Sequence, residues 1–164
     1  MKRFIIPSVI VFALLAGCTK APERLESPGA AIRAVIENNT LNFVLTIRAG
    51  ITNSNSGAAL MDYRGEIILK DGGKRLPKPF GAIPFSVAAI FPFETASVVV
   101  EMRGSEHDFK PIFDLFEIQP DDIVKSGSTD DIFINEKYIE LKTVSYRKER
   151  IEKLIQGKAD EKDK

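Results

Sequence analysis

The chain has 164 residues, with 23 basic and 23 acidic residues, so its formal net charge is zero. This length predicts one domain with short extensions. A hydrophobic content of 44% with eleven phenylalanines is enough for a packed core and excludes a wholly disordered chain. The balanced charge gives no sign of the basic stripe that nucleic-acid binding requires, so no nucleic-acid partner is expected. The single cysteine excludes a disulfide framework.

The N-terminus has the layout of a secretory signal. Lys2 and Arg3 precede an apolar run at residues 4–16, and this run is shorter than the ~20 residues of a membrane-spanning helix. The run ends in Leu15-Ala16-Gly17-Cys18. This ending resembles the lipobox of bacterial lipoproteins, which implies a signal peptide at residues 1–17, cleavage before Cys18 and lipid on the Cys18 thiol. The alternative is a buried cysteine that ends a short membrane anchor.

The residues after Cys18 are polar and contain Pro22, Pro28 and Gly29. They predict a flexible tether, so that residues 18–29 comprise the lipidated cysteine and its linker. By resemblance to the lipoproteins of bacteria with two membranes, Thr19 favours sorting to the outer membrane. We therefore expect a cell-envelope protein that is held at the membrane by the lipid on Cys18 and faces the periplasm.

Residues 30–146 alternate with the period of two that is typical of half-buried strands. Every second residue, counted from the first, is predicted to face inward in the ranges 41–47, 83–89, 96–102 and 139–145. Asp71-Gly72-Gly73 predicts a tight turn. The pattern predicts an all-β fold, an Ig-like β-sandwich of about seven antiparallel strands, although a barrel stays open. Residues 106–124 fit either a strand or a short helix after Pro111.

The last residues, 147–164, are highly charged. Ile151, Leu154 and Ile155 recur at helical spacing before Gly157, which predicts a short C-terminal helix followed by a charged tail. We expect the three apolar side chains to dock on the domain. The alternative is contact with a lipid headgroup or a partner.

One turn and its surroundings resemble a known family. Asn53-Ser54-Asn55 ends a long strand, Tyr63 opens the next strand, and residues 83–102 combine a proline-led stretch with a valine-rich strand. These features resemble the WHy domain of the late-embryogenesis-abundant type 2 family over about residues 30–103. The resemblance implies a β-sandwich with no known active site and themes of stress protection and lipid or protein contact. Ser54 departs from the usual proline, and a generic Ig-like sandwich could carry the same turn.

The residues that could carry chemistry are few. His107 is the only histidine, and Ser105, His107 and Asp108 crowd into one polar stretch, whereas catalytic triads draw on separate parts of a fold. One histidine and one cysteine cannot build a zinc site. The pairs Asp121-Asp122 and Asp130-Asp131 lack the spacing of a calcium loop. We therefore predict a non-enzymatic protein without cofactor or metal.

An apolar stretch at residues 78–93 is the remaining candidate surface. Pro84 and Pro92 exclude a fully paired central strand and predict a sheet edge. Phe80 and Phe93 lie off the inward alternation, and one hypothesis is that they line a groove for a partner. The other is that this stretch only builds the core.

Two non-enzymatic functions agree with these features, and a hydrolase or metal-dependent enzyme stays open as a third. The first is a binding, structural or stress-protective module of the bacterial envelope. The second is a subunit of an envelope secretion or appendage complex, in which an envelope protein would be the partner.

Overall fold

A computed structural model describes residues 23–152 of the chain. The predicted signal peptide, Cys18 and the tail beyond residue 152 lie outside the described residues. Within them, no helix is both long and apolar enough to cross a membrane.

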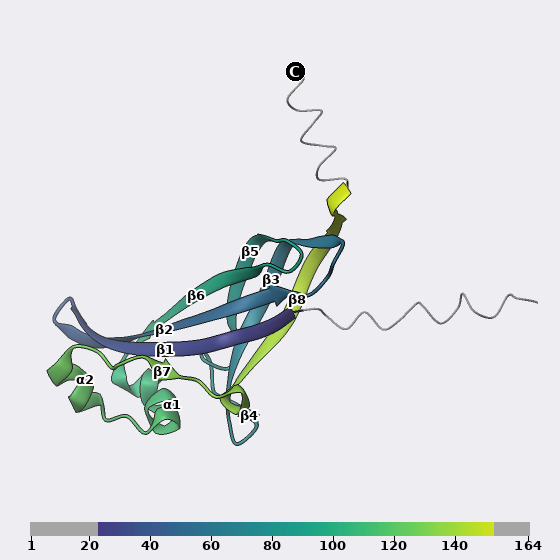
Figure 1. The fold of residues 1–164 in the computed structure, drawn as a ribbon. Coiled ribbons are helices and arrows are strands. Elements are labelled where there is room, and N and C mark those ends of the chain that lie inside the picture. Colours follow the sequence, from purple (N-terminus) through teal and green to yellow (C-terminus); the bar gives the residue numbers. More distant parts are fainter. Residues whose placement is uncertain (1–22, 153–164) are drawn as a thin grey trace, which may run out of the picture.

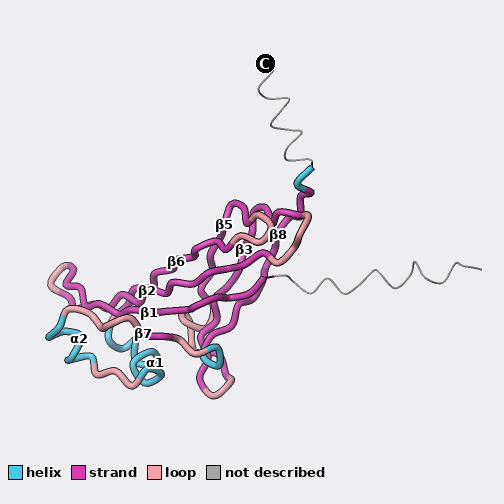
Figure 2. Tube along the Cα trace, viewed as in Figure 1, coloured by secondary structure: helices cyan, strands magenta, loops and turns pink. Residues whose placement is uncertain are grey.

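Two antiparallel sheets pack face to face, which confirms the predicted β-sandwich (Figures 1 and 2). The first sheet has the order β6-β2-β1-β7, and the second contains β4, β3 and β5, with β8 paired to β3. The strands are β1 (Glu23–Glu37), β2 (Thr40–Asn53), β3 (Ala58–Asp71), β4 (Lys74–Arg75), β5 (Ile83–Ile90), β6 (Thr95–Gly104), β7 (Ile132–Phe133) and β8 (Ile139–Arg150). β5 lies at the end of its sheet and pairs with β3. It is therefore an edge strand, as Pro84 and Pro92 predicted.

Two tight turns close neighbouring strands. Asn38 and Asn39 both have positive φ between β1 and β2, and Gly72 and Gly73 have positive φ between β3 and β4. Asparagine and glycine tolerate this conformation, which matches the right-handed twist of a two-residue hairpin. The predicted turn at Asp71–Gly73 is confirmed.

The core lies between the sheets and follows the predicted alternation over most strands. Its inward side chains include Phe43, Leu45, Ile47 and Ile51 of β2, Ile83 and Phe85 of β5, and Val98 and Val100 of β6. Burial of these apolar side chains is the main term that holds the two sheets together.

The alternation shifts at one point in β3 and β8. Asp62 has a φ of 51°, and the pairing register slips between Met61 and Arg64 and again between Arg64 and Gly65. The first slip leaves one extra residue in β3 and the second leaves one extra residue in β8, so each strand changes face once. Tyr146 therefore joins the core side, while Ser145 is exposed. The predicted faces of these two residues are wrong.

Residues 106–124 form helices instead of a strand, so the fold is mostly β and not all β. α1 (Glu106–Phe116) begins five residues before Pro111, and α2 (Pro120–Ser126) begins at a proline. Both helices lie at the end of the first sheet that the second sheet leaves uncovered (Figure 1). The rings of Phe109 and Phe113 pack against Phe43 of β2, with centroids 5.9 and 5.0 Å away.

Both ends of the domain differ from the prediction. β1 begins at Glu23, so residues 23–29 of the predicted tether are a strand paired with β2. Pro28 fits there because the register shifts between Glu26 and Gly29, and a bulge tolerates a missing N–H. Residues 147–150, predicted as the start of a helix, continue β8 and pair with the first residues of β3. Only residues 151 and 152 are helical among the described residues of this segment.

Candidate functional site

Two connections pass from one sheet to the other at the same end of the sandwich. Asn53, the last residue of β2, and residues 54–57 lead from the first sheet to β3 of the second, and residues 91–94 join β5 of the second sheet to β6 of the first. We call these two connections the crossover end. It contains Asn53, Asn55 and Phe93 of the candidate residues.

The side chain of Asn53 joins the two connections. It is fully buried, and its Nδ2 donates to the carbonyl oxygens of Ala58 and Ile90, each at 2.9 Å. Its Oδ1 accepts from the backbone N–H and the side-chain Nδ2 of Asn55, at 3.0 and 2.9 Å. Every polar atom of this amide is therefore used, as burial requires. The sequence predicted only a turn at Asn53-Ser54-Asn55. In the structure, these hydrogen bonds also tie the two connections together.

Tyr63 is also a core residue. Its ring is fully buried and stacks on Tyr146 at 6.2 Å, and its hydroxyl shares a hydrogen bond with the hydroxyl of Thr143 at 2.9 Å. The bulge at Asp62 turns Tyr63 inward, which the alternation of the sequence does not show. The ring fills the sandwich, and its polar end is satisfied by β8.

The connection from β5 to β6 is a tight turn led by proline. The N–H of Glu94 donates to the Phe91 carbonyl at 3.1 Å, Pro92 takes the second position and Phe93 the third. Phe93 has a φ of 59°, which is the pattern of a type II turn. Its N–H donates to the Asn53 carbonyl at 2.8 Å, while its side chain is 71% exposed. Phe93 therefore lies on the surface, as one hypothesis proposed.

Phe80 does not belong to any binding surface. Its side chain is 1% exposed, and its ring meets the ring of Phe109 edge-on at 5.1 Å. The prediction that Phe80 lines a groove with Phe93 is wrong, because α1 folds back over the connection that carries Phe80. The alternation of a single strand cannot reveal a helix that comes from later in the chain.

Ser105, His107 and Asp108 begin α1. The Asp108 N–H donates to Ser105 Oγ, and the Ser105 N–H and Oγ donate to Asp108 Oδ2, at 3.3, 3.0 and 2.7 Å. This is a capping box, which satisfies backbone N–H groups that the first turn leaves free. Ser105 and Asp108 bond directly to each other, without His107 between them. The arrangement forms a helix start and not a nucleophile relay.

The capping box makes stability depend on pH in a defined direction. The Ser105 hydroxyl first, and then its N–H, hold the pKa of the Asp108 carboxyl below its ordinary value of 3.8. The charged form therefore stabilises the folded chain above that value, and this contribution is lost as the pH falls through the lowered pKa. We expect Asp108→Asn to reduce the urea midpoint at neutral pH and to converge with the wild type in acid. Asp114→Asn, on the same helix but outside the cap, is the control and should leave the urea midpoint closer to that of the wild type at neutral pH.

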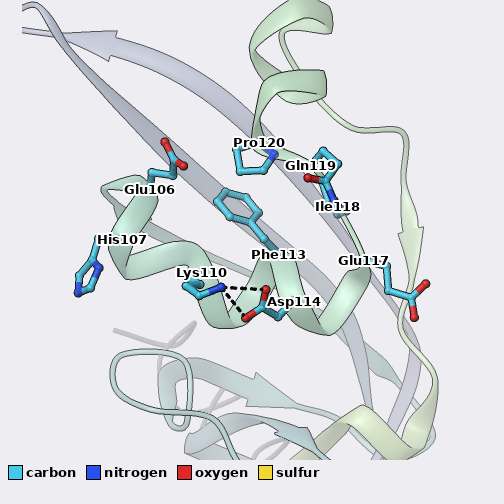
Figure 3. A pocket seen from close by; sticks show the side chains of 9 residues that line it. All are labelled: Glu106, His107, Lys110, Phe113, Asp114, Glu117, Ile118, Gln119 and Pro120. Atoms are coloured by element: carbon cyan, nitrogen blue, oxygen red, sulfur yellow. Dashed lines mark hydrogen bonds and ion pairs between the residues drawn. The ribbon is translucent and has the colours of Figure 1, made fainter.

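An open groove of about 870 Å³ runs along α1 (Figure 3). Its lining consists of Glu106, His107, Lys110, Phe113, Asp114, Glu117, Ile118, Gln119 and Pro120. Lys110 already pairs with Asp114 at 3.2 Å, and His107 and Glu117 point away from the central Phe113. The groove therefore brings no set of free polar groups to one point, as a binding or catalytic site would require.

In each of the pairs Asp121-Asp122 and Asp130-Asp131, one aspartate forms an ion pair with a basic residue. Asp122 lies 3.8 Å from Lys125 on α2, and Asp131 lies 3.2 Å from Arg48. Across residues 23–152, no group of three or more His, Cys, Asp or Glu side chains is placed to hold a metal ion.

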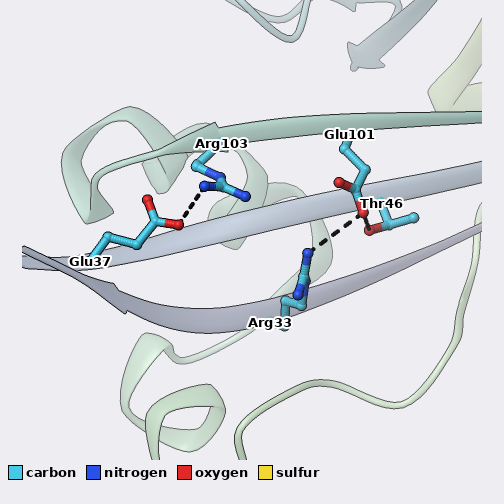
Figure 4. Close-up of polar contacts among 5 residues, drawn as sticks. All are labelled: Arg33, Glu37, Thr46, Glu101 and Arg103. Carbon is cyan, nitrogen blue, oxygen red and sulfur yellow. Dashed lines mark hydrogen bonds and ion pairs between the residues drawn. The ribbon is translucent and has the colours of Figure 1, made fainter.

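The outer face of the first sheet carries a row of charges that pair across strands (Figure 4). Arg33 lies 3.7 Å from Glu101, which also accepts a hydrogen bond from Thr46 at 3.2 Å, and Arg103 pairs with Glu37. Val44 is buried and lies between Arg33 and Arg103 in the register, as expected where long arginine stems extend over an apolar neighbour. This face is a solvated surface with matched charges.

Comparison with known proteins gives no relative: no protein-family model, curated protein or solved structure matches the chain.

Proposed function

We propose that this chain is a lipid-anchored, non-enzymatic β-sandwich module of the bacterial cell envelope. The observation that carries the proposal is Leu15-Ala16-Gly17-Cys18, placed directly behind a charged and then apolar N-terminus. Cleavage before Cys18 would leave the lipidated residue five positions before β1. The sandwich would then be held at the outer membrane on its periplasmic side, as a binding, structural or stress-protective module.

We further propose that the sandwich is Ig-like and related to the WHy domain. Support comes from Asn53, whose amide joins the two crossings between the sheets, and from Tyr63, which anchors the next strand in the core. The two helices between β6 and β7 lie beyond the part of the chain that carries the resemblance.

The absence of an enzymatic role is part of the proposal, and the use of the polar side chains supports it. The side-chain amide of Asn53 makes all its hydrogen bonds to backbone groups and to Asn55. Ser105 and Asp108 bond to each other at the start of α1. Groups used in this way stabilise the fold and are not available to a substrate.

The test of the anchor is Cys18→Ser in the full chain. In the wild type, mass spectrometry of the N-terminal peptide should show the loss of residues 1–17 and the gain of acyl chains on Cys18. Because two or three acyl chains anchor a protein durably, the wild type should stay with membranes after salt washing. Cys18→Ser should carry no acyl chain and should retain residues 1–17.

Thr19→Ser is the matched control, since it changes the neighbouring residue and leaves Leu15–Cys18 intact. It should be lipidated like the wild type. An unmodified Cys18 in the membrane-bound wild type would contradict the anchor and favour the alternative of a short uncleaved membrane segment.

A further inference from the structure

The turn Phe91–Glu94 places aromatic side chains in solvent without a structural reason. Phe91 is 40% exposed and Phe93 is 71% exposed. Phe93 also occupies the turn position with positive φ, at which glycine or asparagine is favoured. A bulky residue there strains the backbone, and the exposed ring gains little packing in return. Strain of this kind, combined with exposed apolar surface, indicates a surface selected for contact with another molecule.

The position of this turn indicates what it contacts. In the register of the first sheet, Glu23 at the start of β1 pairs with Asn53, and the Phe93 N–H donates to the Asn53 carbonyl at 2.8 Å. The exposed ring therefore belongs to the end of the sandwich at which β1 begins (Figure 1). Cys18 precedes Glu23 by five residues, so their Cα atoms are at most about 18 Å apart. A lipid on Cys18 would hold this end, and no other end, next to the membrane.

We propose that Phe91 and Phe93 insert into the membrane surface and fix the orientation of the sandwich on it. This proposal rests on the proposed lipid anchor. The contact of one exposed turn is weak alone, but the anchor keeps it at a high effective concentration of lipid, so a weak contact becomes occupied. The sandwich would then stand with its crossover end on the bilayer and its helices away from it.

The charges beside the turn favour apolar contact over attraction to anionic lipid. Lys148 and Arg150 lie at this end of β8, but Glu94 is in the turn itself, and the Glu26 carboxylate accepts a hydrogen bond from the Thr52 hydroxyl close to the turn. Acidic and basic side chains are thus mixed, unlike the basic cluster that anionic headgroups attract. We expect insertion into zwitterionic membranes, with little dependence on salt.

Tryptophan fluorescence tests the proposal directly, because the chain contains no tryptophan. Phe93→Trp in the full-length chain gives a single reporter on an exposed side chain, and circular dichroism should show a melting temperature like that of the wild type. The protein is reconstituted into phosphatidylcholine vesicles with plain or brominated acyl chains. If the ring reaches the acyl boundary, brominated lipid should quench the indole emission of Phe93→Trp relative to plain lipid, and this emission should shift to shorter wavelength.

Phe133→Trp is the matched control. Phe133 is 75% exposed, like Phe93, but it lies away from the crossover end. Its strand partner is Gly29, which is six residues along β1 from Glu23. The emission of this variant should be the same in plain and brominated vesicles. Unquenched emission from Phe93→Trp, equal quenching of both variants, or quenching that disappears in high salt would overturn the proposed insertion.

The failure of the anchor is measured separately on the same samples. Acylated Cys18 together with unquenched emission from Phe93→Trp overturns the insertion and leaves the proposed function intact. Quenched emission from Phe93→Trp without an acyl chain on Cys18 supports membrane insertion and overturns the anchor. If both signals are absent, both proposals fail.

Discussion

Replacing Asn53 with alanine is expected to lower the free energy of unfolding by about 3–5 kcal/mol, because each buried polar group left without a partner costs about 1–3 kcal/mol. The carbonyls of Ala58 and Ile90 would lose their donor, and the two nitrogens of Asn55 would lose their acceptor. Since these groups belong to both crossings between the sheets, the change weakens the whole end of the sandwich. Urea denaturation should show a lower midpoint with an unchanged slope.

Two companion variants separate the parts of this effect. Asn53→Asp keeps the acceptor and the size of the side chain but cannot donate to the two carbonyls, so it should destabilise as much as alanine. Asn55→Ala removes only one end of the interaction and should cost about 1 kcal/mol. If Asn53→Ala cost no more than Asn55→Ala, the proposed junction between the crossings would be wrong.

Replacing Phe109 with alanine should also cost about 3–5 kcal/mol, the usual loss for a large aromatic side chain removed from a core. Phe109 is fully buried, and its ring centroid lies 5.1 Å from Phe80, 5.8 Å from Phe113 and 5.9 Å from Phe43. These rings come from α1, from the connection before β5 and from β2. Their contact holds the helix on the open end of the first sheet.

Phe133→Ala is the control for this prediction. It removes the same side chain from a site that is 75% exposed, and a surface change of this kind should stay within about 0.5 kcal/mol. The comparison is made by urea denaturation of both variants. A small loss for Phe109→Ala would show that α1 contributes little to the stability of the sandwich.

These variants also separate folding from the proposed membrane contact. Asn53 and Phe109 are buried and act on stability, whereas Phe93 is exposed and its ring contributes little packing. A substitution at Phe93 should therefore change the membrane contact while the fold persists.

The difference between Phe80 and Phe93 shows the limit of local pattern. Both residues lie in the connections that flank β5, and the sequence treats them alike as candidates for a surface. The structure buries Phe80 under α1 and exposes Phe93 on a turn. Burial of a residue in a connection depends on which distant element packs over it, and periodicity within one strand contains no information about that element.

The helical region shows a different limit. Ser105 followed three residues later by Asp108 is a local signal for the start of a helix. It predicts that α1 begins where the structure places it. Pro111 favours a later start, since proline disfavours the interior of a helix. The fold accepts Pro111 because Phe109, Ile112 and Phe113 are buried against the sandwich.

The sequence by itself determined the predominantly β class, the inward faces of β2, β5 and β6, the tight turn at 71–73 and the edge position of β5. These features depend on neighbours in the chain, through side-chain alternation and backbone preference. Only the tertiary structure decided the packing into two sheets rather than a barrel, the register slips that turn Tyr63 and Tyr146 inward, the burial of Phe80 and the meeting of both crossings at Asn53. These features depend on contacts between segments far apart in the chain, which no local pattern specifies.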